Sequence, residues 1–123
     1  MLLSVMEQLE EGGEWLPGIA SGFGGGIGRT GLVCGAITGA VIAAGSRYGS
    51  GSADFDRDRL YEIADSLVRS FEERFGSANC RELIEVDLTD PAERKRALEE
   101  GIFVDKCASY VEFCANQIAK ALP

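Results

Sequence analysis

The chain has 123 residues, a net charge of -8 and no histidine, and 46% of its residues are hydrophobic. This length fits one domain with one core, here residues 1–123, and the hydrophobic fraction argues against disorder. The negative charge disfavours nucleic acid as a partner, because phosphate groups bind to basic surfaces. The lack of histidine excludes Ser-His and Cys-His relays and histidine metal ligands.

No targeting or spanning segment is evident. Residues 1–7 contain no basic stretch and no long apolar run, unlike a secretory signal. The longest apolar run, residues 32–44, is shorter than the ~20 residues that a membrane helix needs. We expect a cytoplasmic protein without a membrane partner, in which cysteines serve redox chemistry, metal binding or packing more often than disulfides.

Taken from the N-terminus, the apolar spacing predicts helices joined by short loops. Residues 2–11 have the pattern of the end of an amphipathic helix, with an apolar face formed by Leu2, Val5, Met6 and Leu9. A short helix is expected at residues 15–21, with Pro17 near its start.

Residues 31–48 are predicted to form a central, buried helix with Thr30 as its N-cap. Small residues recur along it in two adjacent rows, Gly31, Gly35, Gly39 and Ala43, and Ala36, Ala40 and Ala44. Each interior glycine costs a helix about 1 kcal/mol relative to alanine. The rows therefore indicate that another backbone packs closely against this helix.

After a loop at residues 49–52, a helix capped by Asp54 or Asp56 should end before Gly76. A short segment at residues 80–86 should be capped by Ser77 or Asn79, and its end, residues 83–86, is the only weak strand candidate.

Pro91 marks the start of another helix, which should end at Gly101. The last helix is expected over residues 103–122, with one face formed by Val104, Cys107, Val111, Cys114, Ile118 and Leu122. These elements predict an all-α single-domain bundle of five or six helices around residues 31–48.

The glycine-rich segment at residues 26–31 formally matches the dinucleotide fingerprint G-x-G-x-x-G. That fingerprint works after a strand and within a βαβ unit, and neither is evident here. A phosphate loop is also disfavoured, because Arg29 replaces the lysine and Phe23 stands where the first glycine belongs. Exposed amides at the following helix start could still bind an anion or a negatively charged sulfur.

Cys34 and Cys80 each stand near a predicted helix start and near an arginine, Arg29 and Arg81 respectively. This setting favours a thiolate by lowering the pKa of the thiol. For Cys34, a packing role in a tight helix contact is an equal alternative. The polar neighbours of Cys80 argue against a core position.

Cys107 and Cys114 lie on the same predicted helix, seven residues apart. Their Cα atoms would be ~10.5 Å apart at ~1.5 Å per residue, whereas a disulfide requires about 4.4–6.8 Å. They therefore cannot pair in an intact helix, and Cys114 is expected in the core. The chain has no C-x-x-C pair. No cofactor is predicted, and a cysteine-ligated zinc or iron remains an alternative.

The run Cys34-Gly35-Ala36-Ile37-Thr38-Gly39 resembles the Cys-Gly-Ala-x-x-Gly motif of the C_GCAxxG_C_C family of suspected redox proteins. Residues 20–29 resemble the family's glycine loop, residues 79–83 its next cysteine segment, and Cys107 its last cysteine. The family has a further cysteine in its first helix that is missing here, so we expect a truncated start or a lost site. The resemblance implies a redox class and no specific reaction.

The leading hypothesis is a thiol-disulfide oxidoreductase or electron carrier with Cys34, Cys80 and Cys107 as its reactive thiols. Cys80 with Cys107 is the weakly preferred pair. Five further residues are expected to form or activate the loop beside these thiols: Gly28, Arg29, Thr30, Gly35 and Gly39. The partner would be a redox protein or a small thiol, and a homodimer remains open. The alternative is a non-enzymatic helical module that binds a metal or a small ligand.

Overall fold

The computed structural model describes residues 16–122, and within this range the chain forms helices and no strand. The all-α fold is therefore confirmed, while the helix expected at residues 2–11 lies outside the described residues. The elements in chain order are α2 (Leu16–Ala20), η1 (Ser21–Phe23), α3 (Gly24–Ile27), α4 (Gly35–Tyr48), α5 (Arg57–Phe75), α6 (Cys80–Ile84), α7 (Pro91–Glu99), η2 (Phe103–Cys107) and α8 (Ala108–Ala121).

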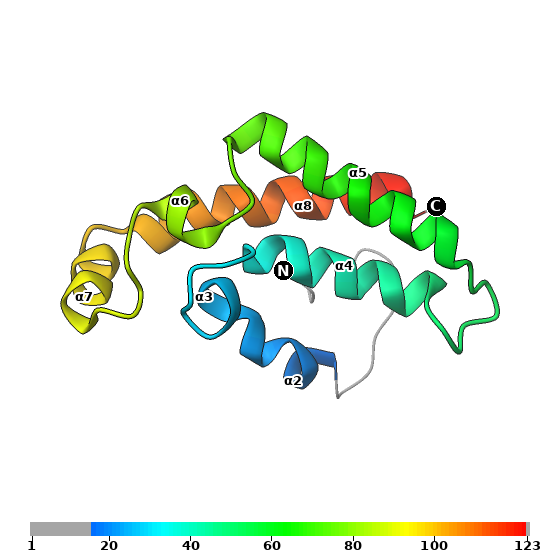
Figure 1. The fold of residues 1–123 in the computed structure, drawn as a ribbon, viewed down its shortest axis with the longest axis horizontal. Helices are drawn as coiled ribbons and strands as arrows, with labels where there is room; N and C mark the ends of the chain where they lie inside the picture. The colour runs from blue at the N-terminus through cyan, green and yellow to red at the C-terminus, as the bar shows by residue number, and fades with distance from the viewer. Residues whose placement is uncertain (1–15, 123) are drawn as a thin grey trace.

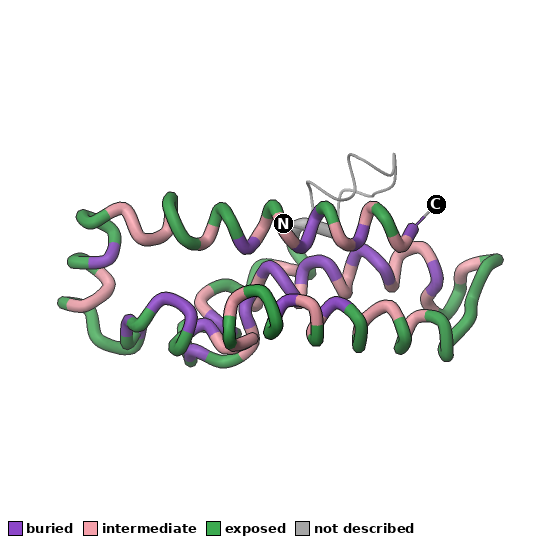
Figure 2. Tube along the Cα trace, turned by 90° about the horizontal axis from the view of Figure 1, so that it is seen from above, coloured by how far each residue is buried: buried purple, intermediate pink, exposed green. Residues whose placement is uncertain are grey.

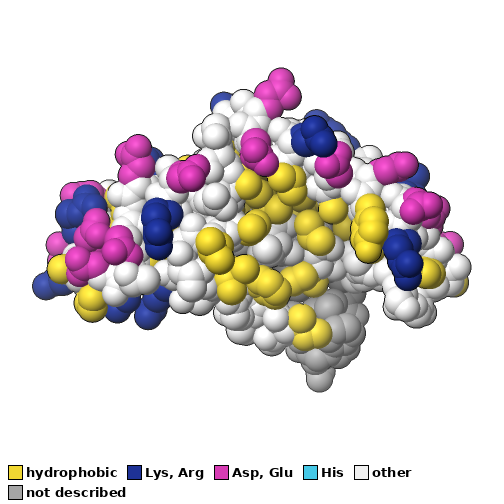
Figure 3. All heavy atoms as spheres, in the orientation of Figure 1, with side chains coloured by type: hydrophobic (Ala, Val, Ile, Leu, Met, Phe, Trp, Pro, Cys, Tyr) yellow, Lys and Arg dark blue, Asp and Glu magenta, His cyan; other side chains and the backbone are white. Residues whose placement is uncertain are grey.

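Three long helices, α4, α5 and α8, contact one another and build the body of the molecule. Helices α2 and α3 lie along one side of α4, and α6 and α7 lie toward one end of the elongated molecule (Figure 1). Buried residues follow the inward sides of the three long helices (Figure 2). Hydrophobic side chains also gather in the middle of one face, with charged groups toward both ends (Figure 3).

Helix α4 is the central, buried helix that the glycine and alanine rows predict. Ala40, Ala43 and Ala44 are completely buried. Without large side chains on these positions, α5 and α8 can approach the α4 backbone closely. The helix begins at Gly35, however, and its N-cap is Cys34 rather than Thr30. The expected start at Gly31 is wrong because Gly31 has a φ of 77°, outside the right-handed helical region.

The predicted cap of α5 and the predicted start of α7 at Pro91 are confirmed. The Asp56 side chain accepts a hydrogen bond from the amide of Arg59, and α5 ends at Gly76 with a φ of 90°. Asp90 caps α7 in the same way through the amide of Ala92, ahead of Pro91. The weak strand candidate at residues 83–86 is wrong, because α6 extends to Ile84 and no strand follows in the described part of the chain.

The last predicted helix is divided in two. Its first five residues, Phe103–Cys107, form the π-helical segment η2, and α8 continues from Ala108. A π-helical turn holds one residue more than an α-helical turn, so it rotates the residues before it out of the α-helical register. Val104 is consequently 74% exposed and does not share the buried face with Cys114 and Ile118.

An aromatic cluster joins α5 to α8. Phe71 and Phe75 on α5 pack edge-on against Tyr110 and Phe113 on α8, with ring centroids 4.8–6.0 Å apart. The hydroxyl of Tyr110 donates a hydrogen bond to the carbonyl of Leu83, at 3.1 Å. This bond fixes the short helix α6, and with it Cys80, against α8. Between residues 16 and 122, no helix combines the length and apolar character that crossing a bilayer requires.

Candidate thiol site

Cys34 and Cys80 are brought together by a short antiparallel pairing of residues 31–34 with residues 78–81. Val33 and Asn79 form an isolated β-bridge. On either side of it, the Cys34 amide donates to Ala78 at 2.8 Å and the Cys80 amide donates to Leu32 at 2.7 Å. In this register the two cysteines are diagonal neighbours on the same face. Such neighbours have Cα atoms about 7–8 Å apart.

Cys107 reaches the same place from η2. All three thiols line one cavity of about 320 Å³, whose other walls come mainly from glycine backbone and apolar side chains. Phe23, Ile84, Leu88, Phe103 and Val111 supply the apolar walls. The cavity lies within the size range of small-ligand sites. Three cysteines that are 46 and 27 residues apart in sequence thus line one cavity.

The glycine loop is a left-handed turn. Five consecutive residues, Gly25 to Arg29, have positive φ values between 59° and 69°. Glycine adopts this conformation freely, whereas each L-residue with a side chain costs roughly 1–2 kcal/mol, as Ile27 and Arg29 must here. Thr30 closes the turn, because its hydroxyl lies 2.6 Å from the Gly26 carbonyl and donates to it.

Gly26 is the point at which this turn meets the thiols. A Cβ atom on Gly26 would lie 2.7 Å from the Cβ of Cys80 and 2.6 Å from the backbone nitrogen of Leu32. Any side chain there would push the turn away from the paired segments. The left-handed turn therefore forms one wall of the cavity at van der Waals distance from Cys80.

The loop residues expected from sequence separate into two groups. Gly35 and Gly39 line the thiol cavity, whereas Gly28 and Arg29 line a second cavity beside it. Thr30 holds the turn, as described above, and caps no helix. Arg29 lines a different cavity from Cys34, and its expected role beside that thiol stays a prediction. Cys114 is completely buried, and its predicted core position is confirmed.

The expected acidic thiol at Cys34 is wrong for this state of the protein. Burial raises the pKa of Cys34 above its ordinary value, and the backbone amides of Ala36 and Ile37 lower it by less. The helix start thus acts on the sulfur as the sequence suggests, but removal of water from around the thiolate outweighs it.

The other thiols are also harder to ionise than free cysteine. Burial, together with negative charge on Cys34 and Cys107, raises the pKa of Cys80 to about 11. Burial and Cys34 likewise raise the pKa of Cys107 and of Cys114, the latter to about 12. Only Cys34 is favoured by helix amides, and this sets it apart from the other three thiols.

Cys80 differs from the sequence expectation in its burial, because it lies in the wall of the cavity and is 9% exposed. Cys107 is half-buried. All four thiols are free. Among residues 16–122, no group of three or more cysteine or acidic side chains is arranged to hold a metal ion.

Sequence reasoning missed three contributors to the site: Gly26, Phe103 and Tyr110. The density of glycine indicates a tight loop but not which glycine contacts a thiol. Phe103 enters the cavity wall from η2, and no sequence signal marks the π-helical turn. Tyr110 positions Cys80 through a bond between segments 27 residues apart, which periodicity cannot reveal.

The fold and the cavity define a small helical protein with clustered thiols. A family model described as "Putative redox-active protein (C_GCAxxG_C_C)" matches residues 1–121, so the chain belongs to this family. The resemblance drawn from the cysteine motif is thereby confirmed. Neither the search of curated proteins nor the search of solved structures found a match.

Proposed function

We propose that this protein carries out thiol–disulfide exchange through Cys34, Cys80 and Cys107. The observation that carries the proposal is the single cavity of about 320 Å³ lined by these three free thiols. Structural cysteines have no need to share an accessible space. A reducing compartment, the cytoplasm, would keep such thiols free between reactions.

Cys34 is the nucleophile in this proposal, because it alone among the three thiols has helix amides that favour its thiolate. Its thiolate attacks one sulfur of a substrate disulfide, a mixed disulfide with Cys34 forms, and the other half of the substrate leaves as a thiolate that takes a proton from water. Cys80 or Cys107 then loses its proton and attacks the Cys34 sulfur. This releases the second half of the substrate and leaves a protein disulfide, so two electrons pass from the protein to the substrate.

The geometry favours Cys80 over Cys107 as the second thiol. The antiparallel pairing holds Cys80 on the same face as Cys34. Cys107 instead lies in the π-helical turn and is more exposed. The sequence preference for a pair between Cys80 and Cys107 stays a prediction. A disulfide between Cys34 and Cys80 needs only a small approach of their backbones, from about 7–8 Å between the Cα atoms of diagonal neighbours to the about 4.4–6.8 Å of a disulfide.

Equilibration of the protein with mixtures of reduced and oxidised dithiothreitol tests the proposal. The expected result is a two-electron transition, read by mass spectrometry after alkylation, that is lost in Cys34→Ser and retained in Cys114→Ala. Thiols that stay reduced across the whole range of potentials would contradict it and would favour a module that only binds a ligand.

A further inference from the structure

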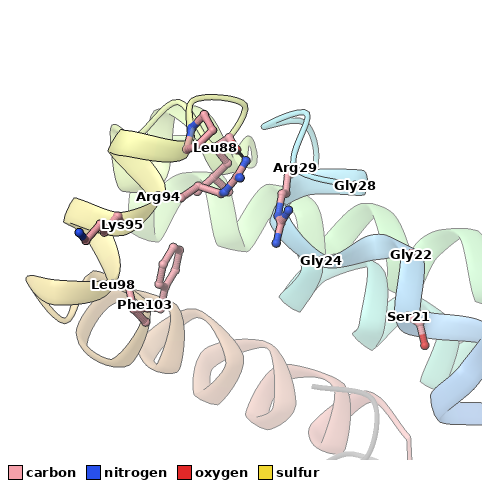
Figure 4. Close-up of a pocket in the computed structure, with 12 residues that line it drawn as sticks. Ser21, Gly22, Gly24, Gly28, Arg29, Leu88, Arg94, Lys95, Leu98 and Phe103 are labelled. Atoms are coloured by element: carbon pink, nitrogen blue, oxygen red, sulfur yellow. Dashed lines mark hydrogen bonds between the residues drawn. The ribbon is translucent and has the colours of Figure 1, made fainter.

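A second, larger cavity of about 830 Å³ adjoins the thiol cavity. Gly24, Gly25, Leu88 and Phe103 line both, so one wall is common to the two spaces. Figure 4 shows the larger cavity between α7 on one side and the turn around α3 on the other. A molecule bound there could extend past Phe103 toward the three thiols.

The larger cavity is lined by positive charge in a protein whose net charge is -8. Its lining includes Arg29, Arg94 and Lys95 but no aspartate or glutamate. Arg29 and Arg94 extend from opposite walls toward the space between them, and Lys95 stands at the outer rim (Figure 4). Cationic side chains that line one space favour the binding of an anion there.

Four acidic residues close in sequence to this cavity have other partners. Asp90 caps α7 by accepting from the amide of Ala92, and Asp87 accepts from Thr89. On α7, Arg96 lies within ion-pair distance of Glu93 and Glu100. Among the described residues, by contrast, Arg29 and Lys95 make no ion pair. Arg94 donates one hydrogen bond, from Nη1 to the Leu88 carbonyl at 2.7 Å.

From this arrangement we propose that the larger cavity binds the anionic end of a small disulfide and thereby presents its sulfur atoms to Cys34. The substrate class is an oxidised low-molecular-weight thiol with carboxylate or phosphate groups. This inference rests on the proposed exchange function and specifies its substrate. The chemistry is one exchange step: the Cys34 thiolate forms a bond to one substrate sulfur, the substrate S–S bond breaks, and the leaving thiolate takes a proton from water.

The cavity walls suit such a molecule in two further respects. Leu88, Leu98 and Phe103 offer apolar surface for its carbon skeleton. The glycines of the left-handed turn present backbone without side chains along the shared wall. A neutral or cationic disulfide would gain no binding free energy from the arginines. The cavity should therefore select among disulfides by their charge.

Exchange rates with three disulfides test the selection: glutathione disulfide, which is anionic, 2-hydroxyethyl disulfide, which is neutral, and cystamine, which is cationic. The measured quantity is the ratio of the anionic to the neutral rate. We expect this ratio to fall about tenfold or more in Arg29→Gln/Lys95→Gln, because charge-assisted hydrogen bonds are lost. The conservative variant Arg29→Lys, in which Lys95 is intact, keeps the positive charge and should largely retain the ratio of the unchanged protein. Lys120→Gln, which removes an exposed cation at the end of α8, is the matched control and should leave the ratio unchanged.

A binding measurement separates this inference from the proposed function. S-methylglutathione carries the charged groups of one half of glutathione disulfide but cannot exchange, and its binding to the reduced protein can be followed by calorimetry. Binding that weakens about tenfold in the double variant supports the anionic cavity. Exchange at equal rates with all three disulfides, without such binding, would contradict anion binding in the larger cavity but would still agree with the proposed exchange function. Binding without any exchange would instead overturn the exchange function.

Discussion

The reactivity of Cys34 depends on two opposing effects at one sulfur atom. Helix α4 begins directly after Cys34, and its first amides favour the thiolate, while burial disfavours it more strongly. The sequence shows the helix start and the neighbouring Arg29, but it does not show that the antiparallel pairing buries the thiol. The protein therefore holds Cys34 mainly as a thiol at neutral pH.

The rate of Cys34 alkylation should consequently rise with pH without levelling off before pH 9. Because the folded pKa is raised, the thiolate fraction grows about tenfold per pH unit up to that point. Mass spectrometry of the iodoacetamide adduct at several pH values measures this rate. A plateau at or below pH 8 would mean that the helix amides dominate and would contradict our assignment.

The glycine-rich segment Gly25–Arg29 forms a left-handed turn, and this turn is one wall of the thiol cavity. Gly26 and Gly28 both have positive φ, at 67° and 59°. They differ in their surroundings, since a Cβ on Gly26 would collide with Leu32 and Cys80 and one on Gly28 would meet nothing within 4 Å. This pair therefore separates the cost of backbone conformation from the cost of a steric clash.

Gly28→Ala should lower the free energy of unfolding by about 1–2 kcal/mol, the usual cost of a left-handed alanine. Gly26→Ala should cost at least about 1–3 kcal/mol more, because the turn must move away from Cys80. Urea unfolding of the two variants under reducing conditions measures the difference. Equal losses would show that the turn does not pack against Cys80.

At the scale of elements, sequence patterns predicted most of what depends on local chemistry. The cap at Asp56, the helix start at Pro91 and the small-residue rows of α4 rest on patterns within a few residues, which the sequence displays directly. The pairing around Val33 and the π-helical turn before Ala108 depend on contacts far along the chain. For this reason the cysteines could be nominated from sequence, but their common cavity could not be derived from it.

For the whole molecule, the stability depends on the interface of α5 with α4 and α8. Phe71 is completely buried there, whereas Tyr61, two to three turns earlier on α5, is 65% exposed. Phe71→Ala should lower the free energy of unfolding by about 3–5 kcal/mol, as expected for a large buried side chain. Tyr61→Ala is the matched surface control and should change it by about 0.5 kcal/mol or less. Similar losses in both would contradict the helix packing.

Stability should also fall in alkaline solution. The folded pKa values of Cys80 and Cys114, about 11 and about 12, lie above the value of 9.0 for a free cysteine. The unfolded chain therefore loses these protons at a lower pH than the folded protein. The contribution of the two buried thiols to the free energy of unfolding is complete below pH 9 and is lost progressively as the pH rises through 11 to 12. Urea unfolding of the reduced protein at pH 8 and pH 10 should show the decrease. A free energy of unfolding that is unchanged over this interval would contradict the burial of these thiols.

The most direct measurement of the central claim is a disulfide map of the protein after mild oxidation at low protein concentration. Proteolysis and mass spectrometry should find an intramolecular disulfide between two of Cys34, Cys80 and Cys107, with Cys114 still reduced. A disulfide that includes Cys114, or oxidation only between molecules, would contradict the shared thiol cavity.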